Sequence, residues 1–149
     1  MATETMGQYV VVPQPGDGHC LNHCLNDIYS IVGKGFISVN AFEDLVCDHI
    51  KTNYDTDVLG RPLLEYNEEY YDLVDESQRN DVDVVHIFID GHFSRITENH
   101  GQHFDVRRRC ACSNVLSCLQ TDFIITSRIF QIVAGGHFLQ VNLEVCVCV

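Results

Sequence analysis

The chain is poor in positive charge. Nine lysine and arginine residues stand against 21 acidic ones among 149 residues, which gives a formal net charge of −12. Such a chain repels nucleic-acid phosphates, and its only basic run, Arg107–Arg109, is too short to reverse this. The balance excludes nucleic acid as the expected partner, and an acidic surface suits a basic protein instead.

Long apolar runs are also missing. No segment approaches the roughly 20 apolar residues that a membrane-spanning helix needs. Residues 1–7 lack the positive region and apolar core of a secretory signal. We therefore expect a cytoplasmic protein without a membrane contact. In that reducing compartment the eight cysteines should be mostly free thiols, metal ligands or a catalytic group rather than disulfides.

Internal repeats of domain size and low-complexity segments are absent. The length of 149 residues, with 46% hydrophobic and 20% charged residues, is typical of one globular domain. A chain of this size can hold a core without disulfides. We expect residues 1–8 to form a flexible arm and residues 9–149 to form the domain.

Hydrophobic periodicity predicts helices in the first half of the chain. A short β-branched run at 9–12 precedes a helix expected from Cys20 to about residue 32. Ser38 or Asn40 can cap a second helix, and a third is expected within 62–76. Beyond residue 79 the pattern changes towards strands, which we expect at 82–89, 123–126, 129–133 and 138–143. Helices followed by strands indicate an α+β fold.

A glycine-rich turn at residues 15–19 delivers Cys20 to the start of the first helix. Gly16 and Gly18 permit backbone angles that other residues resist. At a helix N-terminus the macrodipole and the unpaired N–H groups favour a thiolate and can stabilise an oxyanion. Cys20 is therefore the candidate nucleophile. Cys24 lies one turn later among apolar neighbours, and we expect it in the core.

A histidine from a distant part of the chain is the candidate base. His137 follows Gly135 and Gly136 and opens a β-like run, a rigid position from which a base can face a nucleophile. His92 is the alternative, because a second Gly-His-Phe occurs at residues 91–93. Pairing of such residues is spatial and not sequential, so the sequence leaves both open.

The blocks Asp-Gly-His-Cys-Leu at 17–21 and His-Phe at 137–138 resemble the motifs of the ovarian-tumour (OTU) family of cysteine proteases, most of which are deubiquitinases. The resemblance covers residues 9–32 and 123–143, with the spacing of a compact viral-type member. It implies an OTU-like, papain-type cysteine protease fold, in which helices flank a central, mostly antiparallel sheet.

The resemblance also implies roles. Cys20 would attack the carbonyl at the C-terminal glycine of ubiquitin, and His137 would handle the proton. Backbone N–H groups around Gly18 and His19 would bind the oxyanion. Many relatives carry Asp or Asn two places after the histidine, where this chain has leucine. Asp17 is then the expected orienting residue, although its carboxylate suits loop bracing equally well.

Three further positions follow from the nature of the expected substrate. Ubiquitin ends in Gly-Gly, so Gly135, Gly136 and Phe138 are expected to line a narrow channel for its tail. An ordinary hairpin turn is the alternative role for the two glycines. The partner would be ubiquitin or a ubiquitin-like protein, bound by a monomer in the cytoplasm, or in the host cytoplasm if the chain is viral.

We expect no cofactor. Zinc is the alternative, because Cys110, Cys112 and Cys118 lie close together in the sequence, but their spacing is a poor match to zinc knuckles. Two other functions stay open beside a deubiquitinase. One is an OTU-like protease that processes a viral polyprotein. The other is an inactive OTU-like ubiquitin-binding module, which is favoured by Leu139 and by Asn22, where the family usually has an aromatic residue.

Overall fold

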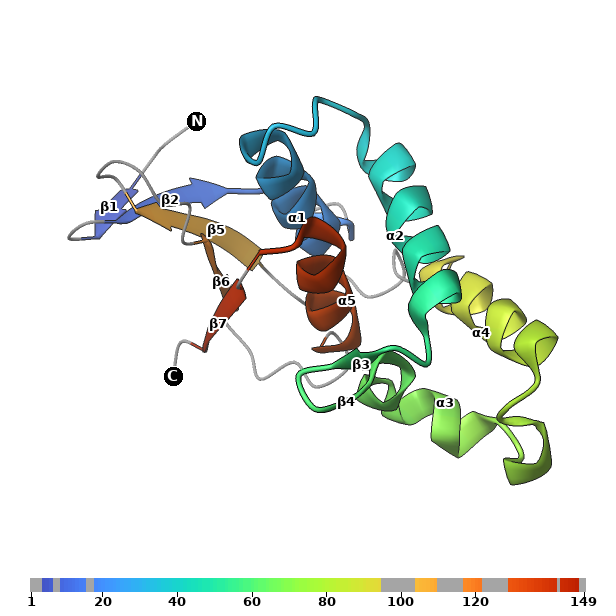
Figure 1. Ribbon diagram of the computed structural model, residues 1–149. Helices are drawn as coiled ribbons and strands as arrows, with labels where there is room; N and C mark the ends of the chain where they lie inside the picture. The colour runs from blue at the N-terminus through green and yellow to red at the C-terminus, as the bar shows by residue number, and fades with distance from the viewer. Residues whose placement is uncertain are drawn as a thin grey trace.

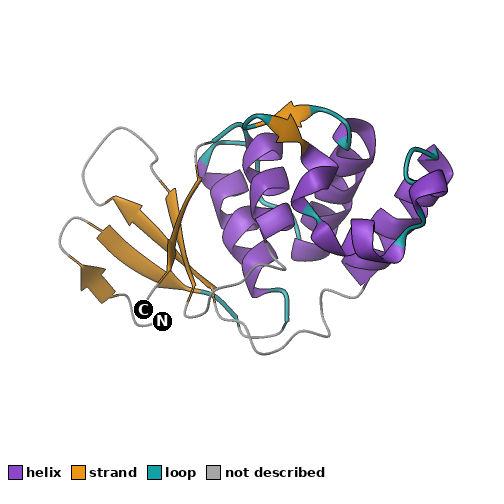
Figure 2. Cartoon of the chain, turned by 90° about the horizontal axis from the view of Figure 1, so that it is seen from below, coloured by secondary structure: helices purple, strands orange, loops and turns teal. Residues whose placement is uncertain are grey.

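The computed structural model describes residues 4–6, 9–15, 18–94, 104–109, 117–121, 129–141 and 143–147. Within these residues the helices gather on one side and a five-stranded sheet lies on the other (Figure 1). The architecture is therefore α+β, as predicted. Figure 2 shows the sheet beside the helical part and not between helices, which differs from the central sheet that the family resemblance implied.

The sheet is mostly antiparallel. Its strands run in the order β1-β2-β5-β6-β7, and only β6 and β7 are parallel neighbours. The expected strand at 9–12 is confirmed as β2. The N-terminal segment expected to be a flexible arm contains β1, which pairs with β2. The bounds are β1 (Glu4–Met6), β2 (Tyr9–Pro13), β5 (Phe104–Arg109), β6 (Ser117–Thr121) and β7 (Leu143–Val147).

The predicted helices of the first half are present. Helix α1 begins at Cys20, and the Ser38 hydroxyl caps the next helix by accepting the Ala41 N–H at 3.1 Å. The third expected helix is divided by Asn67, whose side chain accepts from the Tyr70 N–H. The bounds are α1 (Cys20–Ile31), α2 (Val39–Asn53), η1 (Leu63–Tyr66), α3 (Glu68–Leu73) and η2 (Glu76–Gln78), with a hairpin of β3 (Asp57–Val58) and β4 (Arg61–Pro62) before η1.

The strand prediction at 82–89 is wrong, because this segment is helix α4 (Val82–Ser94). Its β-branched residues suggested a strand, but two helical signals prevail. The Asp81 carboxylate accepts the backbone N–H groups of Asp83 and Val84, which caps the helix. Val85 and Ile89, four residues apart, are both fully buried, as a helix requires.

The strand predictions at 129–133 and 138–143 are also wrong. Residues 129–139 form helix α5 (Ile129–Leu139), and the following strand begins only at Leu143. The composition and burial of α5 explain the error, because a helix that is mostly apolar, with seven of its eleven residues buried, has little amphipathic period to read. The strand expected at 123–126 lies outside the described residues.

Gly135 lets α5 approach α1 closely. A Cβ added there would lie 2.8 Å from Leu25 Cδ1 and 3.1 Å from Leu25 Cδ2, and Leu25 is fully buried. The expected ubiquitin-tail channel at Gly135 is thus occupied by helix packing in this structure. Neither glycine forms the hairpin turn considered as the alternative, because both lie inside α5.

This packing gives a stability prediction with an internal control. Gly135→Ala should destabilise the protein by about 1 to 3 kcal/mol, the usual cost of overpacking a core. Gly91→Ala lies in α4 with nothing within 4 Å of its added Cβ, so it should stabilise by about 0.5 to 1 kcal/mol. Urea unfolding of both variants measures the two values. Equal shifts in the two variants would show that α5 does not pack against Leu25.

Candidate functional site

Cys20 is the first residue of α1 and is 4% exposed. The chain reaches it through Gly18, whose φ of 86° lies in the left-handed region that favours glycine. His19 is the N-cap residue, and its side chain does not bond the helix N-terminus. The turn expected before the nucleophile is therefore present at Gly18. Asp17, the expected orienting residue, lies outside the described residues, so its role stays a prediction.

A polar network surrounds the start of α1. Glu43 of α2 bonds the Nδ1 atom of His19 and accepts a second hydrogen bond, of 2.9 Å, from the Asn22 side chain. Asn22 is 1% exposed, so this carboxylate satisfies an amide that would otherwise be buried without a partner. The network fixes the His19 ring beside Cys20. Sequence reasoning missed Glu43, and the polar Asn22 on an otherwise apolar helix face was the available signal.

His137 lies in the last turn of α5, not on a strand. Helices α1 and α5 run side by side in the same direction, because Leu25 meets Gly135 and Tyr29 stacks on Phe138 with ring centroids 6.1 Å apart. Tyr29 lies two and a half turns beyond Cys20, which is roughly 13 Å of helix rise. His137 is therefore located towards the C-terminal end of α1, and the described contacts do not bring it to Cys20.

His92, the alternative base, has a different position. It lies in the last turn of α4, and its Nε2 accepts a hydrogen bond of 3.0 Å from the side chain of Gln131, which is 1% exposed. Gln131 is one turn before Gly135 on α5, so in the parallel α1–α5 pair we infer that it lies level with the first turn of α1 rather than the last. The His92–Gln131 pair thus lies at the same end of the α1–α5 pair as Cys20.

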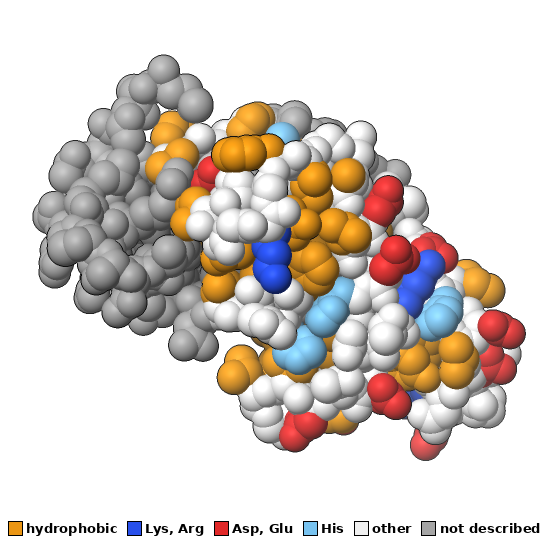
Figure 3. All heavy atoms as spheres, turned by 45° about the horizontal axis from the view of Figure 1, so that its top comes forward, with side chains coloured by type: hydrophobic (Ala, Val, Ile, Leu, Met, Phe, Trp, Pro, Cys, Tyr) orange, Lys and Arg blue, Asp and Glu red, His pale blue; other side chains and the backbone are white. Residues whose placement is uncertain are grey.

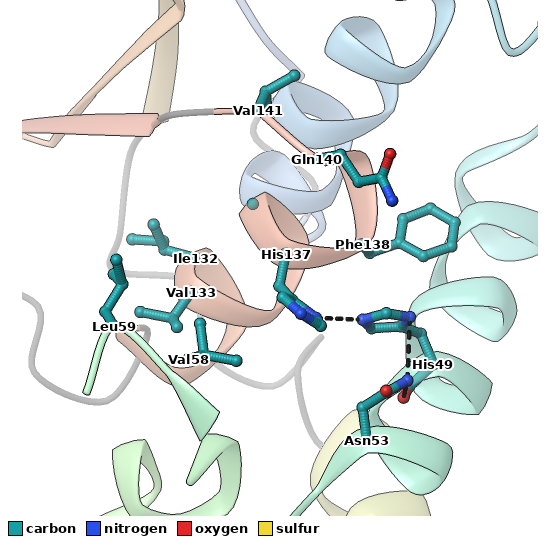
Figure 4. A pocket seen from close by; sticks show the side chains of 11 residues that line it. His49, Asn53, Val58, Leu59, Ile132, Val133, His137, Phe138, Gln140 and Val141 are labelled. Atoms are coloured by element: carbon teal, nitrogen blue, oxygen red, sulfur yellow. Dashed lines mark hydrogen bonds between the residues drawn. The ribbon is translucent and has the colours of Figure 1, made fainter. Parts of the chain in front are cut away.

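Beside the far end of α1 lies a pocket of about 790 Å³ (Figure 4). Helices α2 and α5 and the β3–β4 turn supply its walls. Gly136 and Phe138 of the expected tail channel line it together with His137. Its remaining lining residues are His49, Asn53, Val58, Leu59, Ile132, Val133, Gln140 and Val141.

Two histidines meet in this pocket, one from each helix. The Nε2 atom of His49 lies 2.8 Å from Nδ1 of His137, and Figure 4 shows the two rings pointing toward one another. Burial, and next the electrostatic interaction with His137, lower the pKa of His49. His49 is therefore neutral at neutral pH. Sequence reasoning did not single out His49, because nothing in the sequence of α2 distinguishes it.

The lowered pKa of His49 predicts an acid-sensitive fold. Because the unfolded chain binds the proton more readily, stability should fall as the pH drops below the ordinary value of 6.5. Urea unfolding at about pH 7.5 and about pH 5 measures this loss. His49→Gln cannot titrate, so this variant should lose less stability than the wild type over the same interval. An identical loss in both proteins would remove His49 from the acid response.

The three cysteines considered as zinc ligands cannot be compared in position, because their side chains are not described. Cys110 and Cys112 lie outside the described residues, and Cys118 is in β6 with only its backbone described. Within the described part of the chain, no three His, Cys, Asp or Glu side chains are grouped to hold a metal ion. Cys47 is also buried, and burial raises the pKa of its thiol to about 12, which keeps it protonated and unreactive.

Comparison with known proteins adds no relative. No family model, no curated protein and no solved structure matches the chain. Among the residues that the structure describes, no helix is both long and apolar enough to cross a membrane.

Proposed function

We propose that the chain is a cysteine-dependent isopeptidase of the OTU type, which cleaves after the C-terminal Gly-Gly of ubiquitin or a ubiquitin-like protein. The observation that carries the proposal is the place of Cys20 as first residue of α1, directly after the glycine turn at Gly18. There the sulfur is beside backbone N–H groups that have no acceptor within the helix. The same groups can stabilise the oxyanion when the thiolate attacks a carbonyl.

The reaction follows from these groups. The Cys20 thiolate attacks the carbonyl carbon of the terminal glycine, and the amine of the linked lysine leaves with a proton from the base. Water then hydrolyses the thioester and frees the ubiquitin carboxylate. We assign the base to His92, because its bond to Gln131 suggests a position towards the Cys20 end of the helices. Its Nε2 accepts a hydrogen bond from Gln131, so this bond has to open before Nε2 can take the thiol proton. His137, the residue that the sequence pattern favours, is the alternative.

The burial of Cys20 supports a substrate with a narrow tail. Only 4% of the residue is exposed, so a peptide with bulky side chains has little access to the sulfur. A Gly-Gly terminus has no side chains and can approach such a site. The acidic balance of the chain, with a net charge of −12, suits the arginines and lysines around the tail and hydrophobic patch of ubiquitin in the cytoplasm.

An inactive ubiquitin-binding module is the second candidate. Its support is the separation of His137 from Cys20 together with Leu139, which occupies the position of the usual orienting acid and is 4% exposed in α5. Such a module would bind ubiquitin without cleaving it.

A ubiquitin suicide probe with a C-terminal electrophile tests the proposal. The wild-type chain should form a covalent adduct that Cys20→Ser cannot form. Cys24→Ala, which alters a fully buried thiol one turn away, should still react. Binding without an adduct would support the inactive module. Neither binding nor an adduct, together with cleavage of another peptide, would support the polyprotein protease.

A further inference from the structure

The pocket at the His137 end of α5 has features that the proposed hydrolase does not use. Among the described residues, Leu59 and Gln140 are the two non-glycine residues with positive φ, at 53° and 56°, and both line this pocket. Both conformations belong to local turns, because Leu59 and Gly60 form the two-residue loop of the β3–β4 hairpin and Gln140 follows the last residue of α5. Leu59 is also 86% exposed, so an apolar side chain is held at the rim of the cavity at a cost to the fold.

A chain of hydrogen bonds determines which nitrogen of His137 carries its proton. The Asn53 Nδ2 group donates to the His49 carbonyl at 2.9 Å, which identifies the amide nitrogen, and it also lies 3.4 Å from His49 Nδ1. Nδ1 of His49 is then an acceptor, so its Nε2–H donates to Nδ1 of His137. The ring proton that His137 can donate is then on Nε2. That N–H has no acceptor among the described residues and belongs to a ring that lines the pocket.

The described lining of the pocket lacks acidic and basic side chains other than histidine, although the chain is strongly acidic. Among the described residues that line it, none is Asp, Glu, Lys or Arg, in a chain with a net charge of −12. At the centre of the face shown in Figure 3, histidine side chains lie beside hydrophobic and uncharged ones. A charged ligand would lose its water here without gaining a counter-ion. The walls instead offer apolar contact from Val58, Ile132 and Val133, and a volume of about 790 Å³ is within the usual range for small-molecule sites.

We propose that this pocket binds an uncharged apolar molecule with one carbonyl group, whose oxygen accepts the Nε2–H of His137. The apolar body lies against the valine and isoleucine walls, and Leu59 covers it at the rim. The site is separate from Cys20, so the inference does not depend on the proposed isopeptidase.

Nonan-2-one is a suitable probe, because it joins an apolar chain to one uncharged carbonyl. Its titration should shift the imidazole nitrogen signals of His137 and His49 in NMR spectra and give a saturable Kd. Nonanoate has a similar chain with a charged head and should bind at least about tenfold more weakly. No saturable shift with nonan-2-one, or tighter binding of nonanoate, would overturn the proposal.

Variants of the pocket complete the test. His137→Phe keeps an aromatic ring but removes the donor, so it should weaken ketone binding about fivefold or more. His86→Phe is the matched control, because His86 bonds the Lys51 carbonyl and does not line the pocket. Unchanged binding by His137→Phe would contradict the assigned hydrogen bond.

Leu59→Asn separates a binding role from a structural one. Asparagine accepts positive φ more readily than leucine, so Tm should stay the same or rise. Ketone binding should nevertheless weaken, because the apolar rim is lost. Unchanged binding in this variant would contradict the role of Leu59.

Cys20→Ala should bind the ketone as the wild type does. Ketone binding can therefore be confirmed even if the proposed isopeptidase activity is not found.

Discussion

Cys20→Ser should abolish cleavage of a ubiquitin C-terminal substrate, because a serine hydroxyl at this position lacks the nucleophilicity of a thiolate. The expected loss of kcat is at least about a thousandfold, because the proposed acyl-enzyme forms on the Cys20 sulfur. The substitution replaces sulfur by oxygen in a side chain that is 4% exposed, so the fold should survive. Steady-state kinetics with a fluorogenic ubiquitin substrate and a thermal melt measure both effects.

Cys24→Ala is the matched control for this prediction. Cys24 lies one turn further along α1 and is fully buried, so its truncation should cost about 1 kcal/mol of stability. Its kcat should remain near that of the wild type. A folded but inactive Cys24→Ala variant, combined with an active Cys20→Ser variant, would move the nucleophile to Cys24.

His92→Ala should lower kcat/KM by at least about a hundredfold, the scale expected on losing a general base. The reason is the position of His92 beside Gln131 at the Cys20 end of α1 and α5. His137→Ala should have a much smaller effect, because His137 faces His49 at the other end. The sequence pattern alone predicts the opposite ranking, so the two variants decide between sequence and geometry.

The pH profile distinguishes a base from a structural histidine. If His92 transfers the proton, the plot of kcat/KM against pH should lose its acidic limb in His92→Ala. In a variant that is only destabilised, the plot should keep the shape of the wild-type plot. A thermal melt of each variant detects unfolding, since His92 bonds the buried Gln131 side chain. A large loss in His137→Ala with a normal His92→Ala would restore the sequence-based assignment and require α5 to move relative to α1.

Local signals were sufficient for the first half of the fold. The β-branched run of β2, the Ser38 cap of α2 and the glycine turn before Cys20 each depend on neighbours a few residues away. Such signals can be recognised in the sequence alone, and the structure confirms the three elements that they predicted. The same is true of Cys24, which was expected in the core and is fully buried.

Local signals failed for α4 and α5. Their β-branched and apolar runs suggested strands, but each segment packs one face against other helices, where packing overrides intrinsic preference. The Asp81 cap was the one local sign that could have revealed α4. For α5, the close contact of Gly135 with Leu25 depends on residues far apart in the chain, and no local pattern records it.

The features of the candidate site also fall into those that the sequence predicts and those that only the tertiary structure decides. The sequence by itself determined the turn at Gly18, the helix that begins at Cys20 and the acidic balance, because these follow from neighbouring residues and composition. Only the tertiary structure decided that Glu43 bonds His19 and that His137 pairs with His49. Those contacts join helices whose relative placement depends on how side chains distant in sequence pack together, and a spacing along the chain carries no information about that packing.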